Sequence, residues 1–217
     1  KLNGVSGAMF KYICDEFQSE IEELPSYKLC STEQNKVLLK AIEYGVPQAR
    51  ERVFLVGVNR QFNSTYKYPE PTHGPNRAFK YVTVGDAIMD LPQIQKGEES
   101  HTYNFDINTV TKTERLDYLN RMRGTFSNPP ENLGYAVTSL YNHKSPGHTI
   151  KMLNRISAIK PGENMKKAYE RLVNEGQEEF AKENFPNKLY AARNRRLILT
   201  EPSFTVTSHC LDEMIHP

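Results

Sequence analysis

The sequence predicts an α/β fold: one edge of a sheet domain, followed by a smaller and irregular α+β lobe. Three observations indicate this. Apolar residues recur at helical spacing in residues 5–24, an almost wholly apolar and β-branched run extends from Arg52 to Asn59, and proline, histidine, asparagine and glycine become frequent after Arg60. We therefore place a single boundary near residue 62. The expected parts are residues 1–61, 62–195 and 196–217, the last a return segment toward the first.

The first elements follow from local patterns. In the helix expected at residues 5–24, Ser6 is a suitable N-cap and Pro25 ends the apolar periodicity. Residues 27–31 predict a short strand, and residues 37–41 form a second short apolar run.

The run from Arg52 to Asn59 predicts one strand buried on both faces, as in the interior of a parallel sheet. Later elements are expected to be short, and the charged stretch among them is a solvated helix face. Gly176 weakens the last expected helix, because glycine disfavours helix interiors. The later helices are expected at residues 84–91, 112–123, 149–159 and 164–183.

Bulk properties exclude several classes of protein. The 217 residues carry 28 Lys and Arg against 26 Asp and Glu, and a net charge of +2 does not by itself indicate a nucleic-acid partner. No apolar run approaches the roughly 20 residues of a membrane helix, so no membrane partner and no secretory signal are expected. Three scattered cysteines favour a reducing, cytoplasmic location. No Cys or His pair has zinc-site spacing, so no metal is expected.

The most informative segment is Tyr44–Gly57, which reads YGVPQARERVFLVG. Three of its polar side chains lie at alternate positions: Gln48, Arg50 and Arg52. Alternate side chains of an extended segment share one face, and such a donor-rich face suits a phosphate or the carbonyl edge of a base. The alternative, which the spacing alone favours, is that the two arginines are exposed and paired with Glu43 and Glu51.

This segment resembles the eighth of the ten ordered motifs of DNA cytosine-5 methyltransferases, which is built around a Gln-x-Arg-x-Arg core. Other segments resemble the family in the same order: YPEPTH at residues 68–73, VTVGDAI at 82–88, and RRL and EPSFTVT at 195–197 and 201–207. The resemblance implies the remnant edge of a Rossmann-like methyltransferase sheet, joined to a target-recognition lobe. It covers both ends of the chain and says little about residues 95–190.

Three features of the family are absent. Its nucleophile is a cysteine preceded by proline, whereas Cys14, Cys30 and Cys210 follow Ile, Leu and His. Its Phe-x-Gly-x-Gly and Glu-Asn-Val motifs do not occur either. The resemblance therefore implies the target-recognition half of such an enzyme, inactive alone. S-adenosylmethionine would be bound in the full-length enzyme, mainly by segments outside this sequence.

The family flips a cytosine out of the duplex, adds a thiolate to C6 and methylates C5. By resemblance, Arg52 would donate to O2 of the flipped cytosine and stabilise the charge that develops there. Arg50 and Gln48 would hold the pocket edge or a nearby phosphate, although Gln48 has the alternative role of closing the turn.

Candidates for DNA contact in the variable lobe form two groups. The first is a basic cluster that suits phosphates or, alternatively, is a solvated face: Lys188, Arg193, Arg195 and Arg196. The second is a polar loop that suits base edges or, alternatively, is only an ordered loop: Asn142, His143 and Lys144.

The leading hypothesis is thus the recognition half of a bacterial restriction–modification methyltransferase that acts on double-stranded DNA. The alternatives are the DNA-binding subunit of a split enzyme, whose partner chain carries the missing motifs, and a stand-alone DNA-binding protein. An unpaired sheet edge would also favour self-association.

Overall fold

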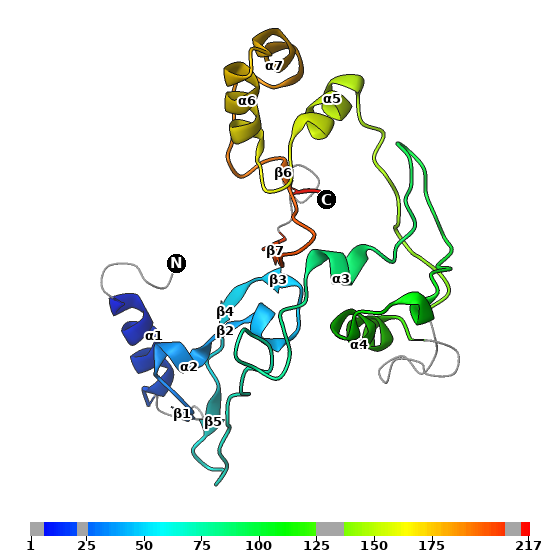
Figure 1. Ribbon diagram of the computed structural model, residues 1–217. Helices are drawn as coiled ribbons and strands as arrows, with labels where there is room; N and C mark the ends of the chain where they lie inside the picture. The colour runs from blue at the N-terminus through cyan, green and yellow to red at the C-terminus, as the bar shows by residue number, and fades with distance from the viewer. Residues whose placement is uncertain (1–6, 21–25, 125–136, 207–213) are drawn as a thin grey trace.

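The computed structural model describes residues 7–20, 26–124, 137–206 and 214–217 (Figure 1). The chain is a mixed α/β structure with short strands. Its helices, including two 3-10 helices (η), are α1 Ala8–Gln18, α2 Gln34–Val37, η1 Ala41–Tyr44, α3 Val84–Ile88, η2 Ile107–Thr109, α4 Thr113–Met122, α5 Ile150–Ala158, α6 Met165–Asn174 and α7 Glu178–Asn184. Its strands are β1 Tyr27–Leu29, β2 Leu38–Lys40, β3 Gln48–Ala49, β4 Glu51–Val53, β5 Gly57–Asn59, β6 Arg195–Arg196, β7 Ser203–Phe204 and β8 Met214–Ile215.

Helix α1 confirms the first expected helix over part of its length. It buries Phe10 and Cys14, one turn apart, against β1 and α2. Gly7 precedes the helix in the left-handed region, with φ 74°. The expected cap Ser6 and the expected stop Pro25 lie outside the described residues.

The prediction of one doubly buried strand from Arg52 to Asn59 is wrong. The run forms β4 and β5, which pair antiparallel with β2 and β1 respectively. The insertion of α2 between β1 and β2 explains the break, because it divides the partner strand into two pieces. None of the residues from 51 to 59 is buried. These strands therefore form two separate two-stranded antiparallel pairs, and neither lies in the interior of a parallel sheet.

The C-terminal part of the described chain forms two short parallel pairs, one of which joins it to β3. Strand β3 pairs with β7, with Gln48 opposite Ser203 and Ala49 opposite Phe204. Strand β6 pairs with β8. In Figure 1 the orange part of the return segment comes down from the later helices, so that β7 lies against β3. The β3–β7 pair thus brings together segments that are more than 150 residues apart in sequence. The hydroxyl of Ser203 donates a hydrogen bond to the Pro47 carbonyl at this contact.

Helices α3, α4 and α5 confirm three expected elements. Two begin with a side-chain cap: Thr83 forms a capping box with Asp86, and Thr149 accepts from the Met152 amide. The expected helix at 164–183 is wrong as a single element, since it divides into α6 and α7. Gly176 has φ 78°, and two hydrogen bonds, Gly176 N–H to Val173 and Gln177 N–H to Leu172, complete a Schellman motif.

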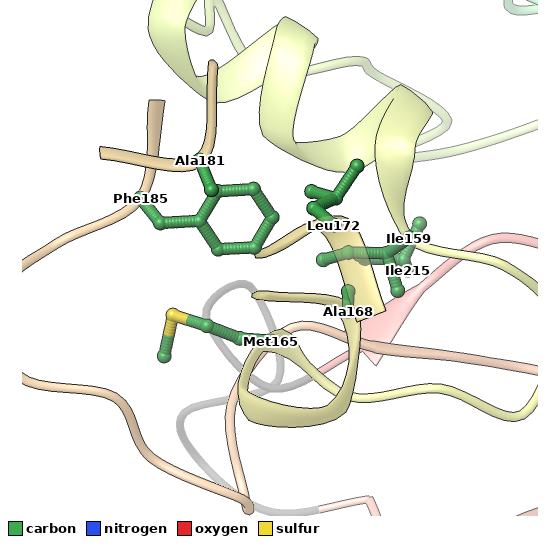
Figure 2. Packing of buried hydrophobic residues seen from close by; sticks show 7 residues of the cluster. All are labelled: Ile159, Met165, Ala168, Leu172, Ala181, Phe185 and Ile215. Atoms are coloured by element: carbon green, nitrogen blue, oxygen red, sulfur yellow. The ribbon is translucent and has the colours of Figure 1, made fainter. Parts of the chain in front are cut away.

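The later helices share a compact apolar core, shown in Figure 2. Its buried residues come from α6, α7, their flanking segments and β8: Ile159, Met165, Ala168, Leu172, Ala181, Phe185 and Ile215. The participation of Ile215 ties the C-terminal strand to these helices. This core is separate from the one beneath α1.

Candidate nucleic-acid interface

The Gln48–Arg52 segment bends instead of running straight. The Gln48 amide donates to the Val46 carbonyl at 2.7 Å, and the Arg50 amide donates to the Gln48 carbonyl at 2.8 Å. Each bond spans three residues, which is the pattern of a γ-turn, and the second is centred on Ala49. The expectation of one extended segment is therefore wrong, because this turn separates Gln48 in β3 from Arg52 in β4.

The side chain of Arg52 is exposed on β4, and its Nη1 donates to the carbonyl of Glu51 at 2.7 Å. The carboxylate of Glu51 instead faces Lys40 at 4.0 Å. Within the described part of the chain, neither Arg52 nor Arg50 forms an ion pair, so the expected alternative of salt bridges to Glu43 and Glu51 is not found. Both guanidinium groups remain available to a ligand.

The return segment brings a third arginine to the same turn. The guanidinium carbon of Arg195 lies 3.9 Å from the centre of the Phe204 ring. Phe204 is paired with Ala49, and the hydroxyl of Thr205 donates to the Ala49 carbonyl at 3.0 Å. The stack therefore places Arg195 next to the β3–β7 pair, on the side of Phe204, and cation–π contact restrains its guanidinium.

A second group of cations surrounds Tyr190. The ammonium of Lys188 lies 5.4 Å and the guanidinium of Arg193 5.1 Å from the centre of this exposed ring. The aromatic face orders the two cations without neutralising them. The sequence reasoning missed Tyr190 and Phe204, although the Lys-x-Tyr-x-x-Arg spacing was a usable signal.

Arg196 does not share this surface with its neighbours. It is half-buried, and its guanidinium donates to three main-chain carbonyls, those of Ile156, Ile159 and His216. Burial also lowers the pKa of its guanidinium. The expectation that Arg196 belongs to the exposed basic cluster is therefore corrected: the side chain holds α5 to the C-terminal strand.

The polar loop at Asn142–Lys144 combines anchored and projecting side chains. His143 Nε2 lies 2.8 Å from the carbonyl of Pro92, so the ring donates there and fixes the loop. The ammonium of Lys144 is 3.7 Å from Glu99 and largely exposed. Asn142 is exposed with φ 60°, a conformation that asparagine tolerates, and the adjacent Tyr141 is 85% exposed.

Among the residues that the structure describes, no group of three or more His, Cys, Asp and Glu side chains lies close enough to hold a metal ion. No helix in the described ranges has the length and apolarity needed to cross a membrane.

Comparison with known proteins decides the family. The family model described as C-5 cytosine-specific DNA methylase matches residues 5–209. The chain belongs to this family.

Several curated members of the C-5 cytosine-specific DNA methylase family are similar to the chain. The type II methyltransferase M.DdeI of Desulfomicrobium norvegicum is 26% identical over 211 residues, which are 95% of this chain and 44% of that protein. M.NgoFVII of Neisseria gonorrhoeae is 36% identical over 46% of this chain and 26% of its own. M.BspRI of Lysinibacillus sphaericus is 54% identical over 55 residues, 25% of this chain and 13% of its own. No solved structure matches significantly.

Members of the C-5 cytosine-specific DNA methylase family take the methyl group from S-adenosylmethionine. A hollow of about 730 Å³ is bounded by β1, α2, β2 and residues 66–71, and no glycine lines it. Nucleotide-like groups are usually cradled by a glycine-rich loop that lets the backbone approach closely. We therefore assign no donor-binding role to these residues.

Proposed function

We propose that this chain is the target-recognition part of a DNA cytosine-5 methyltransferase from a bacterial restriction–modification system. Its relatives are named type II methyltransferases, and the chain spans less than half the length of the curated relatives it matches. The cysteine nucleophile and the donor-binding loop would lie elsewhere in the parent enzyme, so the chain alone would not transfer methyl groups.

The observation that carries this proposal is the parallel pairing of β3 with β7. It supports a layout in which residues 1–61 and 196–217 belong to the Rossmann-like catalytic domain. Residues 62–195 would then form a recognition lobe inserted between them. Because β7, which follows the second end of the lobe, pairs with β3, a duplex held by the lobe would lie next to the Gln48–Arg52 segment.

In this arrangement the residues of the chain bind and orient the DNA. Arg52 donates to O2 of a cytosine flipped out of the stack, which is the only way in which its C5 becomes reachable. Arg50 and Gln48 hold the edge of the pocket, and Arg195 contacts the phosphate next to the flipped nucleotide. A guanidinium suits both tasks, because it presents several donors in a fixed plane.

The rest of the duplex is held by the exposed lobe. Lys188 and Arg193 contact phosphates, which fixes the register of the protein on DNA. Asn142 and Lys144 reach into the major groove, where asparagine pairs with adenine and lysine with guanine. His143 supports them through its bond to Pro92.

Neutralising the pair around Tyr190 tests the contact with the DNA backbone. The double variant Lys188→Gln/Arg193→Gln is expected to weaken duplex binding uniformly across sequences, because phosphates carry no sequence information. Each lost contact reduces the slope of log K against log salt by about one unit. Binding isotherms over a series of salt concentrations measure this slope.

Lys182→Gln is the matched control for charge. Its ammonium is exposed on α7 and already paired with Glu178 at 2.6 Å. This variant should leave the slope nearly unchanged. An unaltered slope in the double variant would show that the cations around Tyr190 face solvent and not DNA.

A further inference from the structure

Gly45 lies under a histidine ring. The glycine has φ 84°, and a Cβ added to it would lie 2.7 Å from Cε1 and 2.9 Å from Nε2 of His73. Real Cβ atoms essentially never approach other atoms so closely. The main chain holds the ring there, because the amides of Thr72 and His73 both donate to the Glu43 carbonyl at 2.9 Å. The ring is thus fixed on the turn that leads into β3.

The other side of the ring leads to the recognition lobe. The His73 and Phe79 rings are tilted by 32°, with centres 5.2 Å apart. The guanidinium carbon of Arg121, on α4, lies 5.9 Å from the centre of the Phe79 ring. Burial, and secondly the charge of Arg121, lower the pKa of His73, so the ring is neutral near pH 7. A small cavity of about 100 Å³ is lined by Gly45, His73, Phe79 and Arg121, among other residues.

We propose that His73 is a positioning residue for methyl transfer, which seats the Gly45 turn and connects it through Phe79 to Arg121 on α4. The inference rests on the proposed function. Its basis is a series of contacts that connects the turn before the Gln48–Arg52 segment with the lobe that would bind the DNA. The residues in contact are, in order, Gly45, His73, Phe79 and Arg121. Gln48 and Arg50 follow the turn within five residues, so a displaced turn moves them out of place.

The test uses the full-length enzyme and single-turnover methylation at saturating duplex and donor. His73→Ala is expected to lower the methylation rate about tenfold, because a small displacement of the groups that position the reacting base slows the chemical step. Duplex affinity should stay within about twofold, since the variant removes positioning and not binding. His73→Phe keeps a flat ring over Gly45 and should restore most of the rate.

Gly45→Ala approaches the same contact from the other side. The added methyl collides with the His73 ring, so the single variant should also be slow. In the double variant Gly45→Ala/His73→Ala the methyl has room, and the combined loss should be smaller than the sum of the two single losses. If His73→Ala does not fold, Gly45→Ala and His73→Phe still test the contact between the Gly45 turn and the ring.

Leu172→Ala is the control for stability. This residue is buried in the core of Figure 2, away from the turn, so the variant should melt earlier and keep a normal rate below its transition. The proposal is overturned if His73→Ala reacts at the wild-type rate, if His73→Phe is as slow as His73→Ala, or if the double-variant losses add. A normal rate in Arg52→Ala would instead count against the proposed function.

Discussion

Replacement of Arg52 by alanine in the full-length methyltransferase is expected to slow methyl transfer about a hundredfold, while duplex binding stays nearly intact. The guanidinium is exposed on β4 and has no carboxylate partner in the described part of the chain. If it meets O2 of the flipped cytosine, it acts mainly as charge develops there. One preorganised donor of this kind contributes about 3 kcal/mol to transition-state stabilisation.

Single-turnover kinetics at saturating DNA measure this effect, with thermal melting recorded alongside. Arg60→Ala is a matched control, since Arg60 is also an exposed arginine and lies 3.9 Å from the carboxylate of Glu20. It should react normally. An Arg52→Ala rate within about threefold of wild type would leave Arg52 as part of the scaffold.

The largest expected loss of stability comes from Asp90. Its side chain is completely buried, and its Oδ2 accepts from Arg123 Nε at 3.0 Å and from the Tyr103 hydroxyl at 2.8 Å. Asp90→Ala leaves a half-buried guanidinium without its carboxylate and a buried hydroxyl without its acceptor. Breaking a buried pair in this way costs about 3–5 kcal/mol of unfolding free energy.

Denaturant unfolding of the chain measures this cost. Asp90→Asn keeps an acceptor for Tyr103 and should lose less, whereas Asp117→Ala, an exposed aspartate on α4, should be close to neutral. A loss below about 1 kcal/mol for Asp90→Ala would mean that the pair does not hold the α3–α4 region together.

The sequence predicted helices better than strands, for a physical reason. A helix is specified by nearby residues, so the apolar periodicity was enough to predict α4 and α5. Gly176, which was expected to weaken the last helix, is where the chain breaks between α6 and α7. The run from Arg52 to Asn59 looked like a buried strand because its composition is apolar. Its pairing depends on α2, which divides the partner strand, and composition carries no information about that.

The candidate site shows the same division. The motif that contains Gln48, Arg50 and Arg52 led to the correct family, while the roles of these three residues stay predictions. Spacing could not show that Arg195 stacks on Phe204 beside this motif while the adjacent Arg196 turns inward to main-chain carbonyls. Both outcomes depend on strand pairing that local spacing does not reveal. Strand β7 pairs with β3, far earlier in the sequence, and β6 pairs with β8 across the intervening return segment.

The most direct test of a target-recognition role is selection of duplexes by the 217-residue chain from a random double-stranded pool, followed by sequencing. If residues 62–195 recognise the target, the recovered duplexes should share one short sequence containing a cytosine, and single-stranded pools should not be enriched. Specific protein–DNA recognition usually exceeds non-specific binding by about a thousandfold or more, so the shared sequence should stand out. Recovery of duplexes without any shared sequence would contradict the assignment of residues 62–195 as the lobe that recognises the target.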